Sequence, residues 1–194
     1  MHICFYDFET SGFSEEKNEV IQIAAVIFEI DGKSWKKLDT FERKLIFDVE
    51  RADEVALAKN CYEPEVWESE AVLSAKAIVD FDVFIKSYKD VQRHGRKPFK
   101  CLRVGGHNID KFDERFMRAW YNKHDMFCAI DYQETYDTLA LAKWYFRFLK
   151  PDLPKPENLQ LSTLCEYFGI KLDNAHDAEA DILANARLAW MLTR

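Results

Sequence analysis

Three short segments of the chain carry acidic and histidine side chains that could do chemistry, and the first is Asp7-Phe8-Glu9. On a strand, side chains two residues apart point to the same face, so Asp7 and Glu9 project together while Phe8 enters the core. Two carboxylates side by side at the end of a buried strand repel each other unless a cation lies between them. The pair therefore indicates a site for a hard divalent ion, although two solvent-facing acids on an edge strand would give the same pattern.

The other two segments are HNIDKFDERF (residues 107–116) and HDAEAD (residues 176–181). The first places Asp113 near the start of a predicted helix, after a strand that ends in two glycines. The second places His176 just before a helix and Asp181 one turn inside it. Taken singly, an acid in a first helical turn is explained by the helix dipole, and a loop histidine is usually a surface residue.

The order of the three motifs resembles that of the DEDDh (DnaQ-like) exonucleases, the family of the bacterial replicative polymerase's proofreading subunit and of RNase T. The resemblance covers nearly the whole chain. It includes FYDFETSG, GGHNIDKFDERF, YDTLALAK, LSTLCEYFGI and AHDAEADILANA, in that order. It implies an RNase H-like α/β fold, a mixed five-stranded sheet of a three-strand antiparallel meander plus two parallel strands, flanked by helices.

The resemblance also implies roles for five residues. Asp7, Glu9, Asp113 and Asp181 would hold two divalent ions, Mg²⁺ or Mn²⁺, with Asp7 bridging both. His176 would be the general base that takes the proton of the attacking water, since its ordinary pKa near 6.5 suits that task at neutral pH. The histidine stands five residues before the last acid, which identifies the histidine branch of the family.

Contacts to the terminal nucleotide are expected from residues that follow the first motif or open the second. These are Thr10, Ser11, Phe13, His107 and Asn108. The expected activity is 3′→5′ hydrolysis of single-stranded DNA or RNA, releasing nucleoside 5′-monophosphates from a free 3′ end. The motifs do not separate DNA from RNA, because contacts to the 2′-OH are made elsewhere. Three alternatives stay open: a dedicated RNA-trimming enzyme, a silent nucleic-acid-binding module, and a phosphatase acting on small nucleotides.

Composition sets the remaining expectations. The net charge of −7 argues against a general nucleic-acid binder, unless bound cations invert the local field. Five scattered cysteines without a CxxC pair predict reduced thiols in a cytoplasmic, soluble protein with no membrane span. Possible partners are a second copy of the chain, a polymerase or another protein.

Candidate phosphate contacts, each also explained as part of a solvated face, are Arg93, Arg96, Lys97, Lys100, Lys143, Arg147 and Lys150. Aromatic residues 144–146 and 148 could stack bases, although their helical spacing favours the core for most of them.

Hydrophobic patterning places these residues on elements of a single domain, residues 1–194. Strands are predicted at residues 3–10, 20–30, 35–47 and 101–104, and a further one runs into Tyr136. Helical periodicity covers residues 52–88, 111–123, 137–148, 161–168 and 177–193. Residues 93–100 are predicted to form a basic loop. Strands first, then strands alternating with helices, favour one α/β domain with a mixed sheet.

Overall fold

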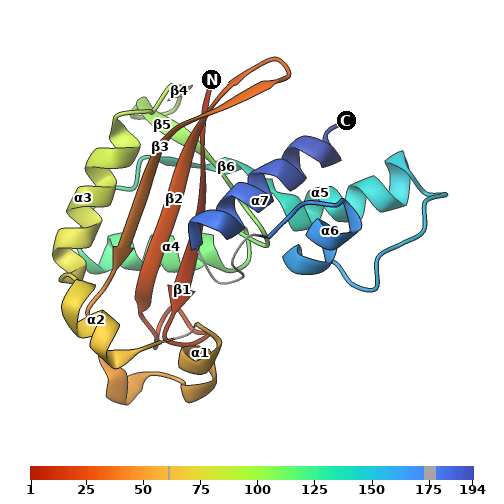
Figure 1. Ribbon diagram of the computed structural model, residues 1–194. Coiled ribbons are helices and arrows are strands. Elements are labelled where there is room, and N and C mark those ends of the chain that lie inside the picture. Colours follow the sequence, from red (N-terminus) through yellow and green to blue (C-terminus); the bar gives the residue numbers. More distant parts are fainter. Residues whose placement is uncertain (61, 173–177) are drawn as a thin grey trace.

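A computed structural model describes residues 1–60, 62–172 and 178–194, and its centre is a six-stranded mixed sheet with helices on both faces (Figure 1). The strands are β1 (His2–Thr10), β2 (Val20–Asp31), β3 (Ser34–Lys44), β4 (Val91–Arg93), β5 (Phe99–Gly106) and β6 (Ile130–Asp137). The helices are α1 (Glu54–Lys59), α2 (Pro64–Glu70), α3 (Ser74–Lys86), α4 (Asp113–Lys123), α5 (Thr138–Trp144), α6 (Leu161–Tyr167) and α7 (Ala178–Leu192). A short 3₁₀ helix, Val49–Arg51, precedes α1, and a π-helical turn, Tyr145–Leu149, follows α5.

The sheet contains the predicted meander and the two predicted parallel strands. β2 pairs antiparallel with both β1 and β3, while β5 runs parallel to β1 and to β6. Gly32 has a φ of 55° in the turn between β2 and β3, where a residue without a Cβ is favoured. β1 therefore lies in the interior of the sheet, between β2 and β5.

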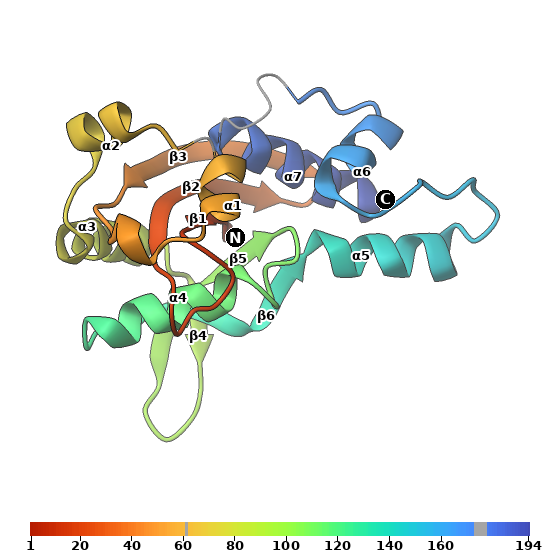
Figure 2. The same cartoon turned by 90° about the horizontal axis from the view of Figure 1, so that it is seen from below.

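The sixth strand is a correction to the predicted five. Residues 93–100 were predicted to be a loop, but Val91–Arg93 pairs antiparallel with Phe99–Cys101, so the basic segment is the tip of a hairpin. The pattern did not reveal β4 because three residues are too few to show an alternation. Figure 2 shows this hairpin projecting from the body of the protein beside β5.

Side chains of β1 alternate between two hydrophobic clusters. Cys4, Tyr6 and Phe8 pack with α3 and α4 on one face. Ile3 and Phe5 pack with β2 and α7 on the other. Phe8 is buried as predicted. Because Asp7 and Glu9 share the parity of Ile3 and Phe5, they belong to the face that α7 covers.

A third cluster joins α5, α6 and α7 beside the sheet (Figures 1 and 2). Ala142 and Phe146 pack there against Leu164 of α6 and Leu188 of α7. The cluster fixes the position of α7 along the sheet and of α5 beside it. Among the described residues, no helix is long and apolar enough to cross a membrane.

Candidate active site

The first acidic pair lies near the C-terminal end of β1, beyond the residues of β1 that pair with β5. β1 and β5 pair from Ile3 to Phe5, whereas the pairing of β1 with β2 continues to Thr10, with a bulge after Glu9. Asp7 and Glu9 therefore lie on a stretch of β1 that pairs with β2 but no longer pairs with β5. Both side chains are half-buried.

Asp113 occupies the space beside that stretch. It is the first residue of α4, is only 3% exposed, and accepts a hydrogen bond from the Phe8 N–H at 3.0 Å. Phe116, in the first turn of α4, is buried, and its ring centroid lies 5.1 Å from that of Phe112 in a tilted arrangement. A contact across 105 residues of sequence thus places the third acid next to the first two.

The two glycines at the end of β5 allow this close approach. A Cβ on Gly105 would lie 2.8 Å from the Phe5 ring, and one on Gly106 would lie 2.9 Å from Ile109. Both distances are shorter than a carbon contact permits. The missing Cβ atoms therefore let β5 lie close to Phe5 of β1 and let the loop before Asp113 fold back onto the end of β5.

Electrostatic coupling links the acids of three elements. Burial and, to a smaller extent, the charge of Asp181 in α7 raise the pKa of Asp7 to about 7, against an opposing effect of Lys59 in α1. Burial likewise raises the pKa of Glu9 to about 8, with Asp7 and Asp181 acting in the same direction. Burial and the charge of Asp7 hold the pKa of Asp113 well above its ordinary value. Neighbouring carboxylates thus oppose the ionisation of Asp7, Glu9 and Asp113, and Asp181 contributes to this effect at Asp7 and Glu9. A group of carboxylates is the donor set that divalent cations prefer.

The acids do not form a closed cage. Among the described residues, no three His, Cys, Asp or Glu side chains converge closely enough to hold an ion without adjustment. Lys59 is a cation that the sequence motifs did not indicate, because it lies on a separate helix, 50 residues beyond Glu9. His176 lies outside the described residues, so its role as the general base stays a prediction.

The sequence of residues 4–189 matches the family RNase_T, described as exonuclease. The matched stretch contains all three motifs and the elements that carry them. The chain belongs to this exonuclease family. This is the kind of family that the sequence motifs resembled.

Individual relatives agree with the family. The chain is 28% identical over 190 residues to a PolC-type DNA polymerase III of Pediococcus pentosaceus, covering 97% of the chain and 11% of that protein. Its fold is similar to E. coli exonuclease I in complex with a dT13 oligonucleotide, with a TM-score of 0.77, 19% identity and coverage of 99% of the chain and 41% of that structure. A zinc-bound form of the same enzyme with single-stranded DNA gives a TM-score of 0.73, 20% identity and coverage of 99% and 40%. The exonuclease thus spans about a tenth of the polymerase and two fifths of exonuclease I.

The residues predicted to contact the terminal nucleotide fall into two groups. Thr10 and Ser11 are buried, and their hydroxyls bond within the β1–β2 connection, to the Gly12 carbonyl and the Glu19 N–H. Phe13 is 63% exposed in the same connection, so its ring is available to a ligand. The roles of all three stay predictions.

His107 and Asn108 hold the second motif in place. The His107 ring lies between Thr138 Oγ1 at 2.9 Å and the Leu159 carbonyl at 3.1 Å, and burial lowers its pKa. Asn108 has a φ of 62°, and its N–H donates to Asp137 Oδ1 at 3.1 Å. Both residues thus have protein partners, and their contacts to substrate stay predictions.

Asp137 is a residue whose role the sequence analysis missed. Its Oδ1 accepts the N–H groups of Leu139 and Ala140, which caps α5, in addition to that of Asn108. An Asp before a predicted helix is a known cap signal, but the sequence could not show that the same oxygen also binds the loop before Asp113. Asp137 therefore couples α5 to the acidic site.

The candidate phosphate contacts and the candidate base-stacking residues differ in how far their side chains are exposed and paired. Arg93 is engaged by Asp131, which is 2% exposed, with Nε 3.1 Å from Oδ1 and a second guanidinium contact, so its predicted availability to phosphate is wrong. Tyr145 and Phe146 are buried, as the helical spacing predicted. Trp144 and Phe148 are 57% and 56% exposed, which the spacing did not predict.

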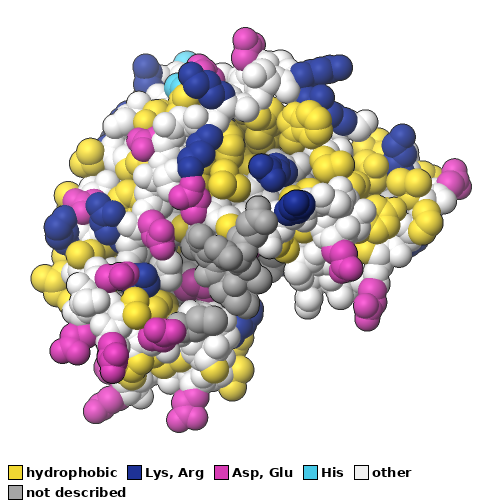
Figure 3. Space-filling view, viewed as in Figure 1, with side chains coloured by type: hydrophobic (Ala, Val, Ile, Leu, Met, Phe, Trp, Pro, Cys, Tyr) yellow, Lys and Arg dark blue, Asp and Glu magenta, His cyan; other side chains and the backbone are white. Residues whose placement is uncertain are grey.

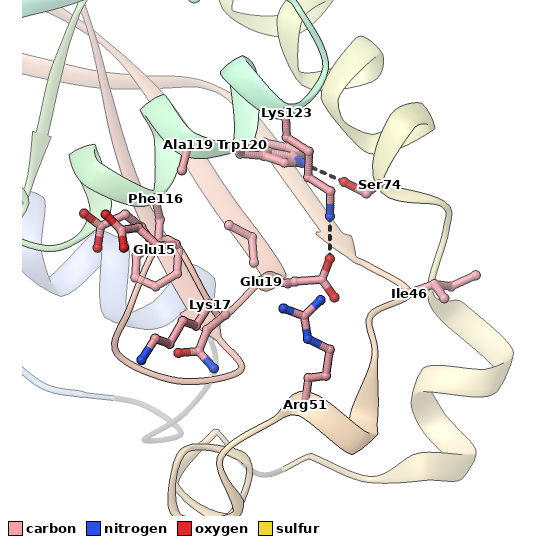
Figure 4. Close-up of a pocket in the computed structure, with 13 residues that line it drawn as sticks. Glu15, Lys17, Glu19, Ile46, Arg51, Ser74, Phe116, Ala119, Trp120 and Lys123 are labelled. Atoms are coloured by element: carbon pink, nitrogen blue, oxygen red, sulfur yellow. Dashed lines mark hydrogen bonds and ion pairs between the residues drawn. The ribbon is translucent and has the colours of Figure 1, made fainter.

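Two hollows on the described surface lie apart from the acids. A cavity of about 330 Å³ lies between the β1–β2 connection and α4 (Figure 4), where Lys123 bonds Glu19 and the Trp120 indole donates to Ser74. A groove of about 860 Å³ runs between α7 and the β2–β3 hairpin (Figure 3). Neither is lined by the four acids or by His107 and Asn108.

Proposed function

We propose that this exonuclease removes nucleotides one at a time from the 3′ end of single-stranded nucleic acid, in a reaction that depends on divalent metal ions. The observation that carries the proposal is a group of carboxylates on β1 and α4, Asp7, Glu9 and Asp113, whose pKa values are raised by burial and by neighbouring carboxylates, with Asp181 of α7 acting on the first two. Such a cluster destabilises the protein unless cations neutralise it, so its presence at a strand end favours a metal-binding function.

Asp7, Glu9, Asp113 and Asp181 are the residues that would hold the ions. All their donor atoms are carboxylate oxygens, which suits Mg²⁺ or Mn²⁺. Bound there, two such ions would activate a water and offset the charge that builds up on the phosphate and on the leaving 3′-oxygen. E. coli exonuclease I has a zinc-bound form, which supports a divalent cation in this chain without deciding which metal it uses.

The residues around the acids have separate tasks. Asp113 keeps its carboxylate fixed against the Phe8 N–H, which positions one ligand before any ion binds. His176 would accept the proton of the attacking water while the phosphorus–oxygen bond to the 3′-oxygen breaks, leaving a nucleoside 5′-monophosphate. Phe13, exposed beside the end of β1, would wedge against the terminal base.

The substrate assignment rests on the structural neighbours. E. coli exonuclease I was crystallised with a dT13 oligonucleotide, which supports single-stranded DNA with a free 3′ end as a substrate of this chain. RNA stays within the proposal, since the motifs are common to both. The polymerase relatives support a further element, that the enzyme works alongside a DNA polymerase rather than only as a free monomer or homodimer.

The test is a nuclease assay on 5′-labelled single-stranded DNA and RNA of one sequence, with Mg²⁺, Mn²⁺ or EDTA, resolved on a denaturing gel. Asp7→Asn and His176→Ala would run alongside the wild type. Asp152→Asn, on the exposed segment after α5, is the matched control. We expect a ladder that shortens from the 3′ end with metal, loss of at least 100-fold for the first two variants, and no change for the control.

Two results would contradict the proposal. If the oligonucleotides stay intact under every metal condition, the protein is better explained as a nucleic-acid-binding module without catalytic activity. Shortening from the 5′ end, or full activity of Asp7→Asn, would show that the acids at the end of β1 are not the catalytic centre.

A further inference from the structure

An exposed pair of aromatic rings lies on the far part of α5. Trp144 ends the helix and Phe148 lies in the π-helical turn that follows, with ring centroids 4.5 Å apart. Both rings are more than half exposed. Large aromatic side chains rarely remain in water as a contacting pair without a partner, so this surface is a candidate binding site.

The π-helical turn separates these rings from their neighbours. The Lys150 N–H bonds the Tyr145 carbonyl at 2.8 Å, which closes the wider five-residue turn. Within it, Tyr145 and Phe146 turn inward to the cluster shared by α5, α6 and α7. Trp144 and Phe148 are left on the outer side. π-turns are frequent at functional positions in helices, in agreement with a use for the exposed pair.

Cations alternate with the rings. Lys143, Arg147 and Lys150 are exposed, and none of them forms a salt bridge with a described residue. Arg147 lies over the Phe148 ring at 5.5 Å. In a protein of net charge −7, this is a local concentration of unpaired positive charge on an aromatic surface. Rings that stack bases and cations that meet phosphates are the combination by which proteins bind single strands without regard to sequence.

The helix that carries the pair also begins beside the acidic site. α5 begins at Thr138, next to Asp137, whose carboxylate holds the loop that leads into Asp113. From there α5 extends away from the sheet (Figures 1 and 2). At ~1.5 Å per residue, Trp144 and Phe148 lie about 9 and 15 Å along this axis. A strand whose 3′ end reached the acids would pass these rings a few nucleotides upstream.

We propose that Trp144 and Phe148 form a stacking platform that holds the bases of the single strand several nucleotides 5′ of the scissile bond, while Lys143, Arg147 and Lys150 contact its phosphates. This inference rests on the proposed function. It concerns substrate length and affinity, and no residue of the platform takes part in the chemistry.

The test separates chemistry from strand binding. The p-nitrophenyl ester of thymidine 5′-monophosphate has a reactive phosphodiester and nothing that could reach the platform, whereas (dT)15 can span both. The double variant Trp144→Ala/Phe148→Ala is compared with Phe99→Ala/Phe127→Ala, which removes another exposed ring pair, with centroids 5.2 Å apart, on a different part of the surface.

The platform predicts that the first double variant raises KM for (dT)15 by about tenfold, with little change in kcat and none in hydrolysis of the ester. Trp144→Phe should keep most of the affinity, because it keeps a ring. In EDTA, anisotropy of 5′-fluorescein-(dT)15 should report the same loss of binding without any catalysis. The Phe99/Phe127 control should match the wild type in all three measurements.

Several outcomes would overturn the platform. One is a Trp144/Phe148 double variant whose KM and anisotropy for (dT)15 equal those of the wild type. Another is a double variant that loses as much activity on the ester as on (dT)15, which would indicate a structural effect. A dimer that this variant converts to a monomer in sedimentation velocity, with unchanged (dT)15 binding, would reassign the surface to self-association. If the wild type hydrolyses neither substrate, the proposed function fails, while the anisotropy measurement still tests strand binding by itself.

Discussion

Neutralising Glu9 should stabilise this exonuclease in the absence of metal and remove most of its stabilisation by metal. The Glu9 pKa is about 8 in the folded chain against an ordinary 4.5, mainly because the side chain is buried and partly because Asp7 and Asp181 are near. The unfolded chain therefore releases this proton first as the pH rises. Folding stability falls between about pH 4.5 and 8 and levels off above that range.

The size of the effect follows from the same values. At ~1.4 kcal/mol per pKa unit, the ionised side chain would cost on the order of 3 kcal/mol at pH 7, and solvent near this half-buried group reduces that to about 2 kcal/mol. For a chain of this length, about 2 kcal/mol corresponds to an increase of roughly 4–8 °C in Tm for Glu9→Gln in EDTA. The wild type should lose stability from pH 5 to 8 more steeply than the variant.

The assay is thermal unfolding at pH 5, 7 and 8, in EDTA and with Mg²⁺ or Mn²⁺. The matched control is Glu29→Gln, on the exposed face of β2, which should leave both the pH dependence and the metal effect unchanged. Metal should raise the Tm of the wild type and of the control well above that of EDTA samples, and raise the Tm of Glu9→Gln far less. A Glu9→Gln protein that is no more stable than wild type at pH 8 in EDTA would refute the electrostatic reasoning, and an undiminished metal shift would refute the assignment of Glu9 as a ligand.

Three further predictions concern the scaffold and are checked by urea unfolding. Asp137→Ala should lower stability by about 2 kcal/mol, because it removes the cap of α5 and the anchor of the loop before α4; an unchanged midpoint would contradict this role. Gly105→Ala should cost about 1–3 kcal/mol, since its Cβ would meet the Phe5 ring, and adding Phe5→Leu should recover part of the loss. Arg93→Ala should cost about 3 kcal/mol by leaving the Asp131 carboxylate buried and unpaired, and adding Asp131→Asn should restore much of it; a loss of strand binding at normal stability would instead return Arg93 to the phosphate contacts.

Much of the fold could be predicted from the sequence because it is encoded in local periodicity. Alternation in β1 places Phe8 in the core and the acids on the opposite face, and the turn at Gly32 joins two long strands. The 3.6-residue period of the last helix places Ile182, Ala186 and Ala189 on the sheet. These patterns depend only on neighbours within a few residues, so they can be recognised in any sequence of sufficient length.

Contacts between segments that are distant in the sequence could not be predicted from such local patterns. The hairpin of β4 and the pairing of Arg93 with Asp131 depend on which segments meet in the folded chain, and a basic stretch gives the same composition whether its arginine is paired or free. The aromatic run after α5 is similar. Its composition is visible in the sequence, but packing against α6 and α7 decided that Phe146 is buried and that Phe148 is exposed.

The sequence by itself determined which residue types could do chemistry and on which elements they lie, because motif order and strand parity are local properties. Tertiary structure decided how the acids influence one another. Asp113 reaches the Phe8 N–H only because two glycines let β5 and the following loop approach β1, and Asp181 acts on Asp7 only because α7 packs across the same face of the sheet. The raised pKa values come from burial and from charges on other elements. Neither the burial of a side chain nor its distance from those charges can be read from the sequence alone.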